Sequence, residues 1–382
     1  MSISRRKFIQ ASLTSTMAVA SSHAIAAATT GDQTSGTQWH DVTTWGLEGR
    51  AWTDQPRKRY FDRFPAKAEQ TVPKPVWNLS RHSAGMAVLF RTDAKQIQVD
   101  YQLLSPSLGM PHMPPTGVSG IDLYGKLNDG PKRWVQVVKP TRQHMVTTIA
   151  NGLDGSMREY TMYLPLYNGV NSMKIGVPAG SRFEPIPPRT KKPILFWGTS
   201  IMHGACASRP GMALPAILGR WFDRPTINLG FSGNGRMDKP VAELIAELDP
   251  AVYCIDCVPN MNARMILERT RPMITILRQA HPTTPIVLVE DRVNTNSEFF
   301  ATRLKYHRDN HKALRHEYDA LVAAGVKHLY YLKGDDLIGR DGEASTDGSH
   351  PSDLGFMRYA LAYEKVLVPL LGPSRRGVGP PF

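Results

Sequence analysis

Short apolar runs alternate with helical stretches from residue 193 to near the end of the chain, and this alternation constrains the fold more than any other feature. A strand that is followed by a helix and then by another strand builds a parallel sheet with helices on its faces. The sequence therefore predicts a doubly wound, three-layer α/β/α domain over residues 190–372. We expect its strands at residues 194–197, 226–229, 252–258, 285–290 and 328–332, and its helices at about 211–222, 239–248, 262–280, 302–324 and after Ser352.

Residues 37–185 carry a different pattern, in which short apolar runs alternate or nearly alternate with polar residues. Turn clusters such as Asn128-Asp129-Gly130-Pro131 separate these runs, and no convincing helix interrupts them. This pattern predicts an N-terminal β-sandwich or jelly roll. Residues 178–193 are rich in proline and charge and are expected to link the two domains. The clearest strand candidates are residues 86–90, 97–101, 134–138 and 173–177.

The first residues have the features of an export signal. Ser4-Arg5-Arg6-Lys7-Phe8-Ile9 is a twin-arginine pattern, and Ala24-Ile25-Ala26 is an A-x-A cleavage pattern. The apolar stretch between them is too short and too rich in Ser and Thr to span a membrane. We therefore predict a twin-arginine signal peptide over residues 1–27, no transmembrane segment, and a periplasmic or secreted protein.

The formal net charge of +13 is spread along the chain rather than held in one block. With no RNA-binding signature and no basic helix, the sequence does not indicate a nucleic-acid-binding protein. A basic surface suits an acidic substrate or an anionic cell envelope equally well.

The cysteines are Cys206, Cys254 and Cys257, too few for a disulfide framework. Cys254 and Cys257 fit C-x-x-C, but they lie in a predicted strand, where residues three apart point to opposite faces. We expect buried thiols, and we predict no metal site.

Ser200 directly follows the first predicted strand of the parallel sheet, in the stretch Ile194-Leu195-Phe196-Trp197-Gly198-Thr199-Ser200. In open α/β sheets, ligands bind at the carboxyl ends of the strands. A serine there is either a helix N-cap or a nucleophile. Asp347 and His350 follow the last strand, three positions apart in a turn, and can supply the base and its orienting carboxylate. Taken alone, the Asp347 turn is better explained by an aspartate that caps a helix.

Two further stretches favour a catalytic interpretation. Gly233 lies in a glycine-rich segment after the second strand, where backbone N–H groups stay free to face a ligand. Asn260 ends the third strand and offers a side-chain amide at the same edge. A serine, a base with its carboxylate, and two kinds of N–H donor are what acyl transfer requires.

These residues occur in the order of the four sequence blocks of the SGNH, or GDSL-like, hydrolases, which residues 193–370 resemble. Gly120-Ile121-Asp122-Leu123-Tyr124 likewise resembles the GxDLY signature of an N-terminal β-domain in one branch of that superfamily. The resemblance implies that Ser200 is the nucleophile, His350 the general base and Asp347 its orienting carboxylate. It also implies an oxyanion hole formed by the Ser200 N–H, the Gly233 N–H and the Asn260 side chain. The chain departs from the family in reading Gly-Thr-Ser for Gly-Asp-Ser and Pro-Asn-Met at Asn260.

Four other residues are candidates for substrate contact. His203 can line the pocket or simply begin a helix, and Met113 can lean over the site from the β-domain or form a plain interdomain contact. Arg236 and Arg264 follow the oxyanion segments and can bind a substrate carboxylate or lie on a solvated face. The charged triplet Glu290-Asp291-Arg292 is explained equally well by rim charges and by an internal ion pair.

Together these features predict a secreted serine esterase that needs no cofactor. By analogy with the family, its substrate is expected to be a short, acetyl ester on a carbohydrate, or another small ester. One alternative is a lipase or thioesterase that acts on longer acyl chains, although no lid of consecutive apolar residues is evident. The other is a non-catalytic carbohydrate-binding protein. The oligomeric state is not predicted.

Overall fold

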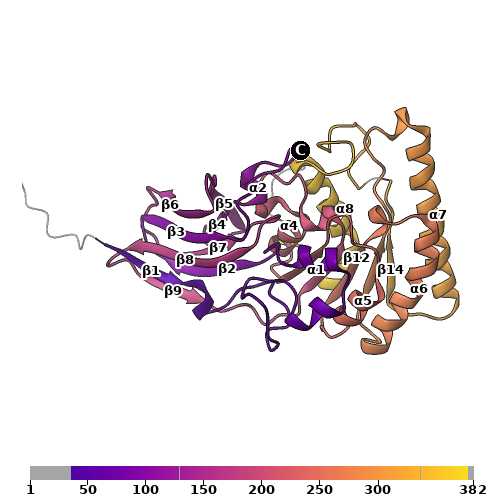
Figure 1. Ribbon diagram of the computed structural model, residues 1–382, viewed down its shortest axis with the longest axis horizontal. Helices are drawn as coiled ribbons and strands as arrows, with labels where there is room; N and C mark the ends of the chain where they lie inside the picture. The colour runs from indigo at the N-terminus through magenta and orange to yellow at the C-terminus, as the bar shows by residue number, and fades with distance from the viewer. Residues whose placement is uncertain (1–35, 129, 336, 377–382) are drawn as a thin grey trace, which may run out of the picture. The chain divides into compact units, whose positions relative to one another are not determined.

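A computed structural model describes residues 36–128, 130–335 and 337–376 of the chain (Figure 1). The predicted signal peptide, residues 1–27, lies outside the described residues. Among the described helices, none is long and apolar enough to cross a membrane.

The C-terminal half contains one sheet of five parallel strands in the order β11-β10-β12-β13-β14. Every residue of the first four strands in chain order is buried, which explains why these strands read as continuous apolar runs. All five strands lie where the sequence predicts them. Their bounds are Ile194–Gly198 (β10), Thr226–Gly230 (β11), Val252–Asp256 (β12), Ile286–Val289 (β13) and Leu329–Leu332 (β14).

Helices cover both faces of this sheet, as the alternating pattern predicts. Leu195 and Trp197 of β10 pack into the core beneath α5, α6 and α7, whereas Phe196 packs toward α4 and α8. Cys254 and Cys257 belong to these two opposite cores, and all three cysteines are free and buried. The helix bounds are Ser200–His203 (α3), Leu214–Trp221 (α4), Lys239–Ile245 (α5), Ala263–Ala280 (α6), Ala301–Ala323 (α7) and Asp353–Leu371 (α8), with 3-10 turns at Pro210–Met212, Val258–Asn260 and Ser297–Phe299.

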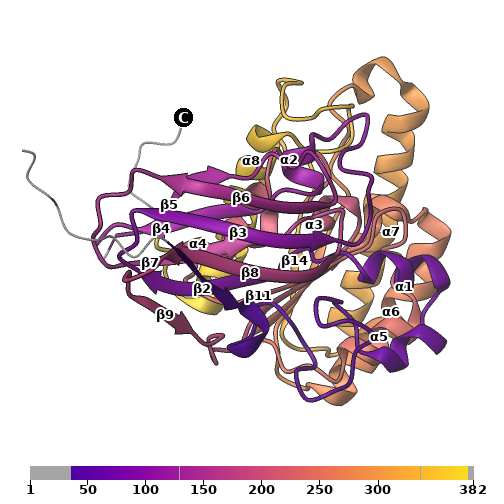
Figure 2. The same ribbon diagram turned by 60° about the vertical axis from the view of Figure 1, so that its left-hand side comes forward.

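The N-terminal half contains two antiparallel sheets, which confirms the predicted β-sandwich. One has the order β1-β8-β3-β6, and the other β5-β4-β7-β2-β9 (Figure 2). Alternate residues of β3 are buried, and they join inward-facing residues of the second sheet in one apolar core. The strand bounds are Thr37–Asp41 (β1), Ala87–Thr92 (β2), Gln96–Leu103 (β3), Asp122–Lys126 (β4), Lys132–Val137 (β5), His144–Asn151 (β6), Arg158–Tyr163 (β7), Val170–Pro178 (β8) and Phe183–Ile186 (β9).

Two features of this half differ from the sequence prediction. The expectation of no helix is wrong, because α1 (Lys74–Ser80) and α2 (Pro115–Val118) are helical, with 3-10 turns at Val42–Thr44 and Ala66–Gln70. Helices of one or two turns are too short to show a 3.6-residue period. The expected linker also contains a strand, β9. Its Pro185 is tolerated because β9 is an edge strand that pairs only with β2.

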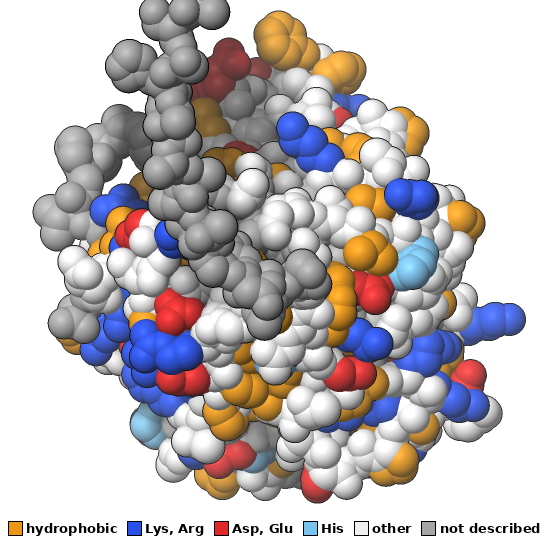
Figure 3. All heavy atoms as spheres, turned by 90° about the vertical axis from the view of Figure 1, so that its left-hand side faces the viewer, with side chains coloured by type: hydrophobic (Ala, Val, Ile, Leu, Met, Phe, Trp, Pro, Cys, Tyr) orange, Lys and Arg blue, Asp and Glu red, His pale blue; other side chains and the backbone are white. Residues whose placement is uncertain are grey.

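The basic residues are spread along the sequence, and one face of the structure shows how they lie on the surface. On the face in Figure 3, Lys and Arg side chains are interspersed with acidic and apolar ones rather than gathered in one patch.

Asp256, the last residue of β12, is a buried carboxyl group that has no cationic hydrogen-bond partner among the described residues. Its Oδ2 accepts hydrogen bonds from the hydroxyl groups of Tyr359 (3.0 Å) and Tyr363 (2.8 Å) on α8. Burial raises the pKa of Asp256 to about 7, although the two tyrosine hydrogen bonds act to lower it. The folded chain therefore holds a proton that the unfolded chain releases near pH 4.

Because the folded-state pKa is raised, Asp256 should make the protein less stable as the pH rises from about 4 to 7. We expect the wild type to lose roughly 3 kcal/mol of unfolding free energy relative to Asp256→Asn between pH 5 and 8. Urea denaturation at both pH values measures this difference. Asp54→Asn, at an exposed aspartate, is the control. Parallel pH curves for wild type and Asp256→Asn would contradict the assignment.

Candidate active site

Ser200 is the first residue of α3, directly beyond the carboxyl end of β10. Thr199 precedes it and caps the helix, since its Oγ1 accepts a hydrogen bond from the Ile201 N–H at 3.3 Å. The capping role therefore belongs to Thr199, which leaves the Ser200 hydroxyl for another partner. The helix ends after one turn at Gly204, whose φ of +107° lies in the region that favours glycine.

That partner is His350, which the chain supplies from the loop before α8. The Ser200 Oγ lies 2.9 Å from the His350 Nε2, and the His350 Nδ1 lies 2.7 Å from the Asp347 Oδ2. Three side chains from two distant parts of the sequence thus form one continuous chain of hydrogen bonds. This arrangement lets the imidazole take a proton from the hydroxyl while the carboxylate fixes its tautomer.

The turn that carries Asp347 holds this carboxylate in its charged form. The Asp347 Oδ1 accepts hydrogen bonds from the backbone N–H groups of Ser349 (2.9 Å) and His350 (2.8 Å). Partial burial acts to raise the pKa of Asp347, but these bonds and the His350 ring outweigh it and lower the pKa to about 2. Asp347 is therefore ionised at any physiological pH and can stabilise an imidazolium.

Arg292, which follows β13, forms hydrogen bonds to the turn that carries Asp347. Its Nε donates to the Ser349 carbonyl at 3.0 Å, and its guanidinium also contacts the Ser349 hydroxyl. Arg292 pairs with Asp291, whose other oxygen accepts from the His307 Nδ1 at 2.7 Å. Burial acts to raise the pKa of Asp291, but the charge of Arg292 and the His307 hydrogen bond lower it. Asp291 and Arg292 thus form the internal ion pair that was one of the two explanations of the Glu290-Asp291-Arg292 triplet. The contact of Arg292 with the Asp347 turn was not expected from the sequence.

The two predicted oxyanion residues follow strand ends that lie level with the end of β10. Gly198 pairs with Gly230 on one side and with Asp256 on the other, so the loops after these strands begin at the same height. Gly233 is exposed, with a φ of +69°. The Asn260 Oδ1 accepts a hydrogen bond from the Gly235 N–H at 3.3 Å. This bond orients the side-chain amide so that its Nδ2 points away from the Gly235 N–H.

Comparison with known protein families identifies the chain. Residues 191–368 match the GDSL-like lipase/acylhydrolase family, and residues 37–183 match the GxDLY domain found at the N-terminus of SGNH-hydrolase-type esterases. The chain belongs to the GDSL-like lipase/acylhydrolase family. No curated protein sequence matches it.

Solved structures support this membership. A protein described as a GDSL-like lipase from Bacteroides ovatus is 32% identical, with 88% of this chain and 99% of that one covered and a TM-score of 0.84. The salicylyl-acyltransferase SsfX3 of a tetracycline biosynthetic pathway is 19% identical (88% and 99% covered, TM-score 0.69). A family two carbohydrate esterase from Cellvibrio japonicus is 11% identical (88% and 98% covered, TM-score 0.55). The last two likenesses concern the fold.

Within this GDSL-like chain, two of the four candidate substrate contacts are buried. His203 is fully buried, where its ring stacks on Tyr167 with centroids 4.1 Å apart and contacts the His82 ring nitrogen at 3.3 Å. Burial, reinforced by the charge of Arg63, holds the pKa of His203 well below its usual value. Met113 is 2% exposed and packs in the core around α4 and α8. Both side chains are therefore shielded from solvent in this structure.

The two arginine candidates lie at the surface. Arg264 forms an ion pair with Glu268 one helical turn further along α6, at 2.7 Å, and this pair accounts for its position. Arg236 is exposed, and no partner for its guanidinium is found among the described residues. Arg236 therefore stays a candidate for substrate contact, whereas the surface ion pair favours a solvated face for Arg264.

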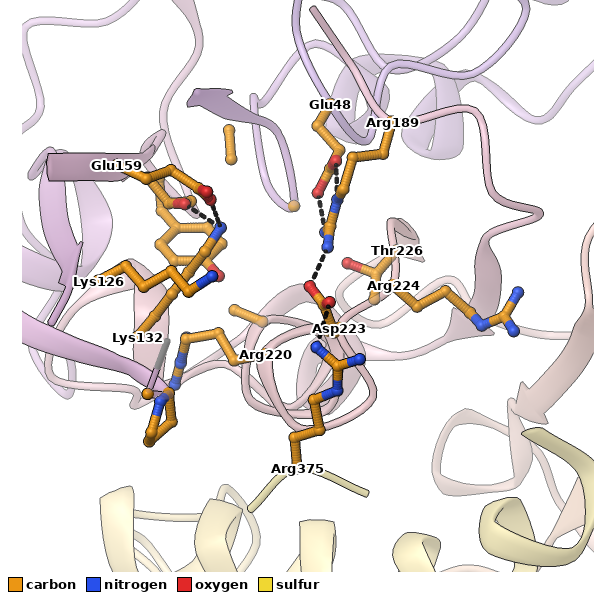
Figure 4. Close-up of a pocket in the computed structure, with 18 residues that line it drawn as sticks. Glu48, Lys126, Lys132, Glu159, Arg189, Arg220, Asp223, Arg224, Thr226 and Arg375 are labelled. Atoms are coloured by element: carbon orange, nitrogen blue, oxygen red, sulfur yellow. Dashed lines mark hydrogen bonds and ion pairs between the residues drawn. The ribbon is translucent and has the colours of Figure 1, made fainter. Parts of the chain in front are cut away.

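A groove of about 430 Å³ lies beside the Asp347 carboxylate. It is lined mainly by polar side chains, namely Asp291, Arg292, Asn294, Thr302, Arg303, His307, Asp347 and Ser349, with Pro259 and Tyr306. A second cavity, of about 440 Å³, includes Thr226 at the amino end of β11, the opposite end from the strand ends that hold Ser200 (Figure 4). In it, Arg189 bridges Glu48 (2.6 Å) and Asp223 (2.7 Å) (Figure 4).

Because Arg292 holds the Ser349 carbonyl, removing its side chain should let the Asp347–His350 turn shift. We expect Arg292→Ala to lower kcat for p-nitrophenyl acetate by about 10–100-fold with little change in KM, the cost of a small misplacement of catalytic groups. Arg142→Ala, at an exposed arginine of the N-terminal half, is the control. Thermal unfolding of both variants separates this effect from a loss of folded protein. A fully active Arg292→Ala enzyme would exclude a positioning role.

Proposed function

We propose that this chain is an exported serine esterase that hydrolyses short-chain, chiefly acetyl, esters of carbohydrates. The observation that carries the proposal is the hydrogen-bonded chain from Ser200 through His350 to Asp347, at the carboxyl ends of the parallel strands. Membership in a family of lipases and acylhydrolases agrees with ester chemistry at this position.

In this mechanism, the His350 Nε2 takes the proton of the Ser200 hydroxyl as its oxygen attacks the ester carbonyl. Asp347 stabilises the imidazolium that forms. The developing oxyanion is bound by the Ser200 and Gly233 N–H groups and by the Asn260 Nδ2. The imidazolium then protonates the leaving alcohol. In the second half of the reaction, His350 activates a water molecule, which releases the acid from Ser200.

The preference for a sugar alcohol and a short acyl group rests on the groove beside Asp347. Its lining offers hydroxyl, amide and guanidinium groups from Thr302, Asn294 and Arg303, which suit a ligand rich in hydroxyl groups. A long acyl chain requires an extended apolar channel, and only Pro259 and Tyr306 provide apolar surface here. The similarity in fold to a carbohydrate esterase agrees with this preference.

Export and domain division complete the proposal. The twin-arginine pattern of residues 1–27 supports export to the periplasm or beyond. The change from antiparallel to parallel pairing between β9 and β10 supports a boundary between a β-domain at 37–185 and a catalytic domain at 190–372.

The first test is acetate release from a panel of acetylated plant and bacterial polysaccharides. We expect release from at least one of them, and faster cleavage of p-nitrophenyl acetate than of the octanoate. Ser200→Ala should lower both activities by at least about 10³-fold, because the covalent step is lost. Ser107→Ala, at an exposed serine, is the control. An equally active Ser200→Ala enzyme would refute the mechanism. Polysaccharide binding with no turnover would favour a carbohydrate-binding protein, and a preference for octanoate would favour a lipase.

The second test concerns Asn260. If its amide binds the oxyanion, Asn260→Ala should lower kcat by about 10²–10³-fold and leave KM nearly unchanged. The matched control is Asn262→Ala, because Asn262 caps α6 by accepting the Met265 N–H at 2.9 Å. That variant should lose about 1 kcal/mol of stability and keep its kcat. Equal kcat values for the two variants would remove Asn260 from the oxyanion hole.

A further inference from the structure

Three side chains with strong affinity for transition metals meet beside the candidate active site. They are His112, Cys206 and His350, and each has a donor atom within 4.8 Å of the donor atoms of the other two. Cys206 follows α3, whereas His112 lies on the loop before α2 in the N-terminal half. The rings of His112 and His350 have centroids 5.7 Å apart. Because 94 residues separate His112 from Cys206, no sequence spacing reveals the group.

Hydrogen bonds hold the loop of His112 against the segment of Cys206. The Cys206 thiol donates to the backbone carbonyl of His112 at 3.3 Å, and the Thr116 hydroxyl donates to the Ser208 carbonyl at 2.6 Å. The loop itself is closed by paired backbone bonds between Met110 and Met113, at 3.0 and 3.1 Å. These contacts hold the two segments together, while the His112 side chain itself is exposed.

The donor set matches zinc better than other common ions. Two imidazoles and one thiolate are typical zinc ligands, and tetrahedral bonds of about 2.0–2.3 Å place donor atoms roughly 3.5 Å apart. The widest pair of donor atoms must therefore come closer by about 1 Å, and His112 is the most exposed of the three side chains. The Asp347 carboxylate already contacts the His350 Nδ1 at 2.7 Å, and zinc-bound histidines usually have such a partner on the second nitrogen.

We propose that His112, Cys206 and His350 form an inhibitory zinc site. The proposal rests on the esterase function proposed above. Zinc on the His350 Nε2 occupies the atom that lies 2.9 Å from the Ser200 Oγ, so that the serine loses its base. Binding releases the thiol proton of Cys206 to solvent and leaves a fourth position for water or the Ser200 oxygen. Removal of the metal restores hydrolysis.

The first arm of the test measures inhibition. Purified protein in metal-free buffer is titrated with zinc chloride while hydrolysis of p-nitrophenyl acetate is followed, and a chelator is then added. We expect reversible inhibition of the wild type. His112→Ala and Cys206→Ser should each raise the half-inhibiting zinc concentration by at least about tenfold, since even the loss of an outer-shell partner costs that much. His316→Ala and Cys254→Ser, which alter residues outside the group, should leave it unchanged.

The second arm does not depend on esterase activity. Cobalt(II) replaces zinc, and a thiolate-to-cobalt charge-transfer band reports coordination by the Cys206 sulfur. We expect one cobalt per chain and this band in the wild type and in Ser200→Ala, and no band in Cys206→Ser. This arm decides the proposal even if no ester is cleaved, so failure of the zinc site and failure of the esterase function are distinguishable.

A third variant tests whether any loss of metal binding in Cys206→Ser comes from the missing thiol or from misfolding. Cys206 has a φ of +68°, in the region that favours glycine, so Cys206→Gly removes the thiol from a backbone that suits the new residue. It should behave as Cys206→Ser does. The proposal is wrong if zinc does not inhibit the active wild type, if it inhibits wild type and variants at equal concentrations, or if the cobalt band is absent from the wild type or persists without Cys206.

Discussion

The site depends on a close backbone contact between two loops. The Phe231 N–H donates to the Gly198 carbonyl at 2.9 Å, which joins the loop after β11 to the turn before Ser200. A Cβ atom on Gly235 would lie 2.1 Å from the Gly198 oxygen, and one on Gly230 would lie 2.0 Å from the His203 nitrogen. Side chains at these glycines would drive the loops apart, and with them the serine and the expected oxyanion donors. The spacing between the Ser200 hydroxyl and the proposed oxyanion donors is therefore set by backbone contact, before any polar side chain acts.

A buried arginine of the N-terminal half, Arg63, holds the end of β11 next to that backbone contact. Arg63, only 2% exposed, donates to the carbonyls of Asn228 (3.0 Å) and Gly230 (2.8 Å) in β11, and also to those of Leu79 (2.6 Å) and His82 (3.1 Å). Burial lowers the pKa of Arg63 to about 9, which still leaves it charged at neutral pH. One guanidinium thus satisfies carbonyls from both halves of the chain. The segment before β2 therefore helps to hold β11 in place, and with it the loop that carries Gly233.

Local sequence patterns predict the secondary-structure elements of the α/β domain and the residues at the strand ends. All five parallel strands, their helices and the strand-end positions of Ser200 and His350 follow from apolar runs and turns. Contacts between distant residues have no such signal, and Arg292 on the Ser349 carbonyl and Arg63 under β11 were not foreseen for that reason. His203 was a candidate because it is near Ser200 in sequence. The structure buries its ring against Tyr167, a residue distant in sequence that gives no local signal.

The hydrogen bond between the His350 Nδ1 and the Asp347 carboxylate suits His350 to two proposed roles, a general base and a zinc ligand. A carboxylate on Nδ1 leaves the Nε2 lone pair directed at the serine, and it is also the partner that zinc-bound histidines usually have on their second nitrogen. What separates the two outcomes is the number of further donors within reach. A lone imidazole holds zinc weakly, whereas His112 and Cys206 turn it into one ligand of three. Since His112 comes from the N-terminal half, its loop would determine, in the proposed zinc complex, whether His350 is available as a base.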